Sequence, residues 1–145
     1  MSLRTIEEHL AAILATLRPT DVIEVTLVEA LGRTLAQPAV AQVDLPGFAN
    51  SAMDGYAVRA EDCAGASESA PVELPVVGDI PAGDTRSLML EPGTTWRIMT
   101  GAPLPEGADA IVPVERSDGG TGTARLRLAP EAGLHVRSRG EDVRA

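Results

Sequence analysis

Several residue types are rare in this sequence, and each shortage excludes a class of protein. It holds one cysteine, Cys63, which excludes an internal disulfide and any metal site built on several cysteines. Aromatic residues make up only 2% of the chain, so a hydrophobic core has to be built from Val, Leu, Ile and Ala. No segment approaches the ~20 apolar residues of a membrane-spanning helix, and no charged leader with an apolar stretch opens the chain. We therefore expect a cytoplasmic protein that has no membrane partner.

Lysine is absent, so all 12 basic residues are arginine, and 21 acidic residues give a formal net charge of -9. An acidic chain binds nucleic acid poorly, because contact with phosphates needs concentrated positive charge. We therefore expect no nucleic-acid partner. If a phosphorylated or oxyanion substrate binds, arginine or a divalent cation has to offset the acidic side chains.

The start of the chain has the pattern of an amphipathic helix. Thr5 and Glu8 have the spacing of a capping box, and apolar residues then recur at helical spacing until Pro19 stops the pattern. The sequence therefore predicts a helix over residues 6–17. Its apolar face, expected to pack in a core or against a partner, consists of Ile6, Leu10, Ile13, Leu14 and Leu17.

Shorter elements follow. Thr26 and Glu29 repeat the capping pattern ahead of Gly32, which predicts a short helix over residues 27–31. Eleven Pro and 14 Gly favour short elements and many turns in the whole chain. Turn signals separate six candidate strands, at residues 56–59, 74–78, 94–99, 110–115, 123–128 and 134–137.

Regularly spaced short strands are typical of a compact β-barrel or sandwich. The expected fold class is therefore mainly β with some α (α+β). A helical N-terminal arm and an extended linker segment precede a small β-barrel-like module in this interpretation.

Patterns that carry chemistry are few. The histidines, His9 and His135, are far apart in the sequence, and neither has a partner at metal-ligand spacing. His135 falls in a candidate strand, where we expect a packed or hydrogen-bonded side chain. A P-loop and a Gly-x-Gly-x-x-Gly pattern are both absent. Three polar segments remain as candidate sites: residues 50–55, 97–103 and 139–142.

Each segment has two interpretations. Asp54, in a turn, either closes an Asx-type turn or lies at a cleft edge as an acceptor or magnesium-directed carboxylate. Thr100-Gly101 is either an ordinary strand end or a place where a hydroxyl and backbone N–H groups hold an oxyanion. Glu141-Asp142 suits either a divalent cation or a solvated tail.

Taken in order, the three segments closely resemble the signature of the molybdopterin molybdenumtransferase family. That family is called MoeA in bacteria, and its animal relative is the C-terminal E domain of gephyrin. The resemblance extends from the first helix to the last residue. The runs that carry it are Pro46-x-Phe48-x-Asn50-Ser51-Ala52-Met53-Asp54-Gly55-Tyr56-Ala57, Arg97-Ile98-Met99-Thr100-Gly101-Ala102-Pro103-x-Pro105-x-Gly107-Ala108-Asp109 and Arg139-Gly140-Glu141-Asp142.

The resemblance implies an enzyme that inserts molybdenum from molybdate into adenylylated molybdopterin, with magnesium as cofactor. It also implies a homodimer, in which the β-rich second domain of one subunit faces the pterin-binding third domain of the other. By motif, the implied catalytic residues are Asp54, Thr100 and Asp142. The implied substrate-binding residues are Asn50, Ser51, Arg97, Gly101 and Glu141, and no metal ligand is assigned.

Members of the family continue well past the Gly140-Glu141-Asp142 motif. We therefore expect an N-terminal part, with an incomplete helical and linker domain over residues 1–52, to which residues 138–145 return. The β-rich second domain is expected over residues 53–137. Such a part should not transfer molybdenum by itself.

Two other functions compete with the enzyme. One is a scaffold or assembly module of gephyrin type without chemistry, and the other is a free-standing β module for an unknown ligand. The retained Asp54, Thr100 and Asp142 favour the enzyme, because a pure scaffold has no chemical need for them. Further expected partners are other proteins of molybdenum cofactor biosynthesis, and the apolar helix face predicts self-association.

Overall fold

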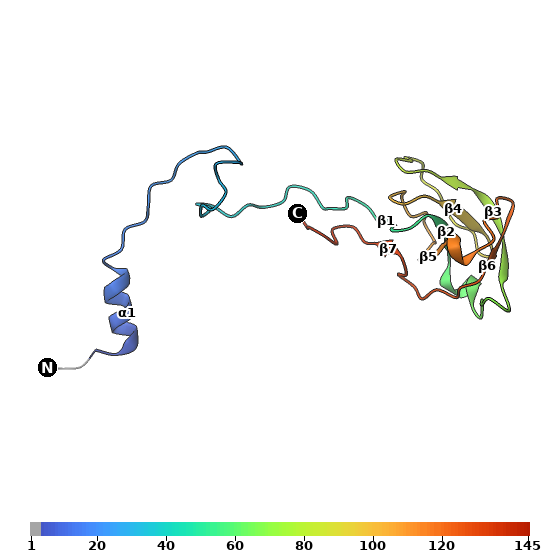
Figure 1. The fold of residues 1–145 in the computed structure, drawn as a ribbon, viewed down its shortest axis with the longest axis horizontal. Helices are drawn as coiled ribbons and strands as arrows, with labels where there is room; N and C mark the ends of the chain where they lie inside the picture. Colours follow the sequence, from blue (N-terminus) through green and yellow to red (C-terminus); the bar gives the residue numbers. More distant parts are fainter. Residues whose placement is uncertain (1–3) are drawn as a thin grey trace. The chain divides into compact units, whose positions relative to one another are not determined.

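The computed structural model describes residues 4–145, which form two compact units, Met1–Ala39 and Val40–Ala145. We call them the N-terminal unit and the β-rich unit and describe each by itself (Figure 1). The predicted boundary after residue 52 concerns the domains of a longer protein and stays a prediction. The first three residues of the predicted first domain lie outside the described residues.

The N-terminal unit contains one helix, α1 (Ile6–Leu14). The predicted capping box is present, because Glu8 N donates to Thr5 Oγ1 at 3.2 Å and Thr5 N donates to Glu8 Oε2 at 2.9 Å. The predicted extension of this helix to residue 17 is wrong. Thr16 Oγ1 donates to the Ile13 carbonyl at 2.7 Å, and this local bond replaces the next helical turn.

The predicted helix over residues 27–31 is also wrong, because these residues form turns. Its capping contacts are present: Thr26 N donates to Glu29 Oε2 at 3.1 Å, and Ala30 N donates to the Thr26 carbonyl at 2.9 Å. Five residues are too few to offset the cost of helix nucleation without tertiary packing. Packing is missing here, since apolar residues such as Leu27 and Leu31 are more than 90% exposed.

The β-rich unit contains seven strands, and the expected class, mainly β with some α, is confirmed (Figure 1). Five of them form one sheet in the order β5-β2-β4-β3-β6, in which only β3 and β4 run parallel. The other two form an antiparallel ribbon. The strands are β1 (Asn50–Ser51), β2 (Gly55–Val58), β3 (Val72–Ile80), β4 (Thr95–Ile98), β5 (Ala110–Pro113), β6 (Thr123–Leu126) and β7 (Val136–Arg137).

The strand β2 lies inside the sheet, between β5 and β4, and its four residues are all buried. Side chains alternate between the two faces of a strand, and each face of the sheet has its own apolar cluster. Tyr56 and Val58 belong to one cluster, and Ala57 packs with Ile98 and Ile111 in the other. The sheet therefore buries both of its faces at β2, which is why this strand has a continuous apolar sequence.

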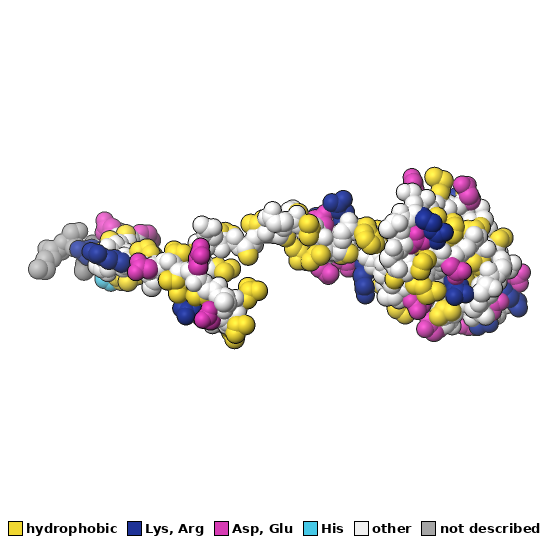
Figure 2. Space-filling view, turned by 90° about the horizontal axis from the view of Figure 1, so that it is seen from above, with side chains coloured by type: hydrophobic (Ala, Val, Ile, Leu, Met, Phe, Trp, Pro, Cys, Tyr) yellow, Lys and Arg dark blue, Asp and Glu magenta, His cyan; other side chains and the backbone are white. Residues whose placement is uncertain are grey.

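The sheet curls so that its two edges approach. Arg127 N, just after β6, donates to the Arg116 carbonyl at 2.8 Å, in the 3-10 turn that follows β5. Tyr56 Oη donates to the Gly120 carbonyl at 2.9 Å, which ties the same connection to β2. Figure 2 shows acidic and arginine side chains interspersed over the outside of this unit. Among residues 4–145, no helix has the length and apolar character needed to cross a membrane.

All six predicted strands are found, with bounds that differ by a few residues. The strand predicted over residues 110–115 stops at Pro113, because Val114–Arg116 turns into a 3-10 helix. The strand predicted over residues 134–137 contains only its last two residues. His135 has φ 56°, which no strand permits. The helical turn η1 (Ala60–Cys63) follows β2, and β1 was too short to predict.

Candidate functional site

Asp54 and Thr100 meet at one end of the β-rich unit. Thr100 donates two hydrogen bonds to Asp54 Oδ1, one from its backbone N and one from Oγ1, both at 2.7 Å. The two residues are 46 positions apart in the sequence. Thus the fold brings together two of the three predicted catalytic residues.

The loops that carry these residues are fastened to each other through their main chains. Ser51 N donates to the Ala102 carbonyl at 3.0 Å, and Gly101 N donates to the Ser51 carbonyl at 2.8 Å. The Asp54 carbonyl accepts from Val114 N at 3.0 Å. Bonds on both sides of Asp54 therefore fix where its carboxylate lies.

Gly55 explains why the strand can begin directly after Asp54. Its Cα faces the backbone of β5, and a Cβ there would overlap the carbonyl oxygen of Val112. Only glycine allows the two strands to approach this closely. Gly55 is therefore required by the close packing of β2 against β5 as well as by the turn at Asp54.

The pKa of the Asp54 carboxyl is lowered, first by the hydrogen bond from the Thr100 hydroxyl and second by the one from the Thr100 backbone. Asp54 is exposed, so water also reaches this carboxylate. Within residues 4–145, Asp54 Oδ2 accepts no hydrogen bond, because both bonds from Thr100 end on Oδ1. The arrangement holds an ionised carboxylate on an exposed residue, with Oδ1 fixed by two hydrogen bonds and Oδ2 outside them.

The predicted oxyanion donors are engaged inside the protein. Both Thr100 donors go to Asp54, and Gly101 N goes to Ser51. Ala102 N donates to the Met99 carbonyl at 3.0 Å. In this arrangement the segment orients a carboxylate, and its amides do not point at an external anion.

Asn50 and Ser51 lie in the same loop, but their side chains are buried. Asn50 Nδ2 donates to the Phe48 carbonyl at 3.2 Å. Ser51 Oγ donates to the Met53 carbonyl at 2.5 Å and accepts from Met53 N at 3.2 Å. Both side chains shape the turn that presents Asp54.

No hydrogen bond or ion pair within residues 4–145 joins Arg97 to this pair. Arg97 lies on β4 beside Ile98, and its Nε pairs with Asp79 Oδ1 of β3 at 3.0 Å. The ion pair is partly exposed, so its contribution to stability is small.

Glu141 and Asp142 lie in a bend after β7, next to the isolated bridge between Leu45 and Val143. Glu141 Oε2 accepts from Ser138 N at 2.7 Å, and Asp142 N donates to the Leu45 carbonyl at 3.0 Å. Asp142 is exposed. No hydrogen bond in the described part of the chain joins either carboxylate to Asp54, so the third predicted catalytic residue is not bonded to the pair.

Asp44, which the sequence analysis missed, holds this second segment in place. Its Oδ2 accepts from Arg139 Nε at 2.6 Å and its Oδ1 accepts from Ala145 N at 2.9 Å. The pKa of Asp44 is lowered, first by the backbone bond from Ala145 and then by the bond from Arg139. The only signal in the sequence was its place at the head of the Pro46–Tyr56 run.

A metal site is not formed by these residues alone. Among residues 4–145, no group of three or more His, Cys, Asp or Glu side chains is placed to hold an ion. Asp54 has one carboxylate oxygen outside its bonds to Thr100, whereas magnesium takes six oxygen ligands. The donor set therefore does not fit a complete magnesium site.

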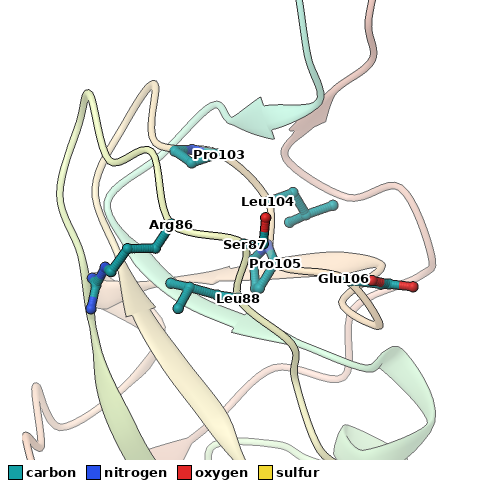
Figure 3. Close-up of a pocket in the computed structure, with 7 residues that line it drawn as sticks. All are labelled: Arg86, Ser87, Leu88, Pro103, Leu104, Pro105 and Glu106. Atoms are coloured by element: carbon teal, nitrogen blue, oxygen red, sulfur yellow. The ribbon is translucent and has the colours of Figure 1, made fainter.

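A small cavity of about 210 Å³ lies beside the Thr100 loop, on the segment that follows it (Figure 3). In Figure 3 the side chains of Arg86 and Glu106 extend away from each other, and Ser87 lies between them among the apolar side chains. No predicted site residue lines it. Its lining is Arg86, Ser87, Leu88, Pro103, Leu104, Pro105 and Glu106.

Comparison with known proteins gives a consistent result. The family model of the MoeA N-terminal region (domain I and II) matches residues 4–145. Molybdopterin molybdenumtransferase 2 of Mycobacterium tuberculosis is 50% identical over 143 residues, covering 99% of this chain and 35% of that protein. Molybdopterin molybdenumtransferase of Synechococcus elongatus is 43% identical over 127 residues, covering 87% of this chain and 32% of that protein.

A solved structure agrees. The molybdopterin biosynthesis MoeA protein from Pyrococcus horikoshii superposes with a TM-score of 0.73 at 36% identity, covering 83% of this chain and 32% of that one. The chain thus spans about a third of the length of the curated relatives it matches.

Proposed function

The chain belongs to the MoeA N-terminal family, and we propose that it is the N-terminal part of a molybdopterin molybdenumtransferase. The whole enzyme would insert molybdenum from molybdate into adenylylated molybdopterin, as a step in molybdenum cofactor biosynthesis. Three matches support this activity: the family model and the two relatives named molybdopterin molybdenumtransferase.

One observation carries the proposed site: the double hydrogen bond from Thr100 to Asp54 Oδ1. A purely structural carboxylate in a turn usually bonds to its own backbone neighbours. Asp54 instead bonds through Oδ1 to a residue far away in sequence, and the residue is exposed. We assign Oδ2 the role of accepting a proton or a hydrogen bond from water or substrate during attack on the adenylate phosphate.

Thr100 acts through Asp54 in this proposal. Its two donors keep the carboxylate ionised and hold Oδ1 in one direction, so that Oδ2 has a defined position. Gly101, Asn50 and Ser51 maintain the loop, because their hydrogen bonds remain inside it. Arg97 would reach an anionic substrate only after leaving Asp79.

Asp142 and Glu141 belong to the proposed cleft on the strength of the motif alone. They lie on the segment that the ion pair between Asp44 and Arg139 holds in place, so their position depends on that ion pair. We propose that substrate binding in the complete enzyme requires both this segment and the Asp54 loop.

Magnesium would need further ligands. Those ligands would come from substrate phosphates and other parts of the enzyme, because the described residues form no metal site. A bound magnesium ion would offset the negative charge of substrate and carboxylates. We further propose a cytoplasmic homodimer, which works with other proteins of cofactor biosynthesis and needs a pterin-binding domain outside these residues. The 145-residue chain by itself would be inactive.

Asp54→Asn in the complete protein tests the proposal. The amide keeps the size of the side chain but removes its charge, so cofactor formation and AMP release from adenylylated molybdopterin should fall about 100-fold. Glu73→Gln is the control, because Glu73 pairs with Arg125 on the surface between β3 and β6. Unchanged rates for Asp54→Asn, together with unchanged assembly, would support the scaffold function instead.

A further inference from the structure

His135 is the single non-glycine residue of the described chain with φ in the left-handed region, at 56°. Few residues other than glycine adopt this conformation, and Asn, Asp and His are those that tolerate it best. His135 lies between a turn that contains Gly133 and the strand β7. A costly backbone conformation persists only where its surroundings hold it in place.

The main chain of His135 contacts the loop of the proposed site. Its carbonyl accepts from Ala52 N at 2.9 Å. Ala52 follows Ser51, whose N and carbonyl bond to the loop of Thr100 at 3.0 and 2.8 Å. The bond from Ala52 therefore attaches the Asp54 loop to a second segment, in addition to the loop of Thr100.

The segment around His135 is itself anchored on the sheet. Gly133 N donates to the Asp109 carbonyl at 2.7 Å, and Ile111 N donates to the Leu134 carbonyl at 3.0 Å. These bonds fix the chain before His135, and the pairing of Val136 with Ser51 fixes the chain after it. Between two fixed points, the backbone angles of His135 decide where its carbonyl points.

From this geometry we propose that His135 is a positioning residue for Asp54, acting through its left-handed main chain. The imidazole is not needed for this role. Glycine and asparagine adopt the same backbone conformation, alanine does so at a cost, and valine is the worst fit because its branched Cβ clashes at positive φ. This inference rests on the proposed role of Asp54.

The test compares His135→Asn, His135→Gly, His135→Ala and His135→Val. In the 145-residue chain, NMR follows the Thr100 amide resonance and the titration of the Asp54 carboxyl carbon. We expect the Asn and Gly variants to match the parent chain. In the Val variant the pKa of Asp54 should rise toward its ordinary value, because the Thr100 donors no longer hold Oδ1, and the Ala variant should be intermediate.

In the complete enzyme, the Val variant should lower kcat about tenfold with little change in KM, because a small misplacement of a reacting group is costly. The Asn and Gly variants should stay within about twofold of the parent. If the Val variant fails to fold, the Ala variant carries the comparison.

Two results would overturn the inference. One is a folded Val or Ala variant in which the Thr100 amide and the Asp54 titration are unchanged. The other is an equal loss in the Asn, Gly and Val variants, since that would assign the effect to the imidazole. Neither NMR measurement depends on molybdenum transfer, so failure of the proposed function leaves this test intact.

Discussion

The two units use the same apolar residue types with opposite results. Ile13 of the N-terminal unit is 47% exposed, whereas Ile111 of the β-rich unit is completely buried. The N-terminal unit has good local signals, including two capping pairs, yet it buries none of its helix residues. The β-rich unit has weaker local signals and a complete core. The comparison shows that local propensity starts an element, while long-range packing decides whether it is maintained.

Replacing an isoleucine in each unit should show the largest difference in stability between the two units. Ile111→Ala should lower the free energy of unfolding by about 2–5 kcal/mol, because it leaves a cavity in the apolar cluster on one face of the sheet. Ile13→Ala is the matched control, and its effect should stay within about 0.5 kcal/mol. Urea denaturation followed by the fluorescence of the single tryptophan, Trp96, measures both. An equal loss of unfolding free energy in the two variants would mean that Ile13 of α1 is packed against other residues in solution.

A second comparison uses glycine. Gly55→Ala should lower the free energy of unfolding of the β-rich unit by about 1–3 kcal/mol, because the added Cβ meets the backbone of Val112. Gly32 lies in the N-terminal unit with open space around its Cα. Gly32→Ala should therefore leave the unfolding of the β-rich unit unchanged. A similar loss for both variants in the same denaturation experiment would contradict the division into units.

The capping box gives a smaller and purely local effect. Thr5→Ala removes the side-chain acceptor of Glu8 N and should destabilise α1 by about 1 kcal/mol. Hydrogen exchange should speed up for the amides of α1 and for no strand of the β-rich unit. Faster exchange in β2 would show that the helix and the sheet unfold together.

The smallest effect concerns pH. Hydrogen bonds from Arg86 lower the pKa of Asp84 from 3.8 to about 2. Because the folded-state pKa is the lower one, the stability from this pair is fully present above pH 3.8 and is lost as the pH falls toward 2. Asp84→Asn should flatten this part of the urea-midpoint profile, measured from pH 5 to pH 2. An unchanged profile would mean that the pair adds nothing to stability, although the Asp84 side chain is only 6% exposed.

Much of the fold could be predicted from the sequence, and the reasons are local. Alternation and turn residues located six strands, and the Thr5–Glu8 box located the start of α1. The end of α1 was missed, because a short apolar stripe does not reveal whether anything covers it. The strand β1 was missed because two residues carry no period, and the conformation of His135 depends on contacts with distant residues.

The candidate site was predicted in part. The motifs identified Asp54 and Thr100, and the fold joins them. Motif spacing could not show that Ser51 is buried or that Arg97 pairs with Asp79, since both facts depend on register between strands. Asp44 escaped notice for the same reason, because its partner Arg139 lies 95 positions away.

The ion pair between Asp44 and Arg139 has a consequence for the architecture of a larger protein. Leu45 N donates to the Val143 carbonyl at 2.8 Å. The segment that leads into the strands of the β-rich unit and the segment that follows them therefore run side by side. A body whose two connections leave from one point has the topology of an insertion. Such a body can be accommodated between two neighbouring residues of a host domain without separating them.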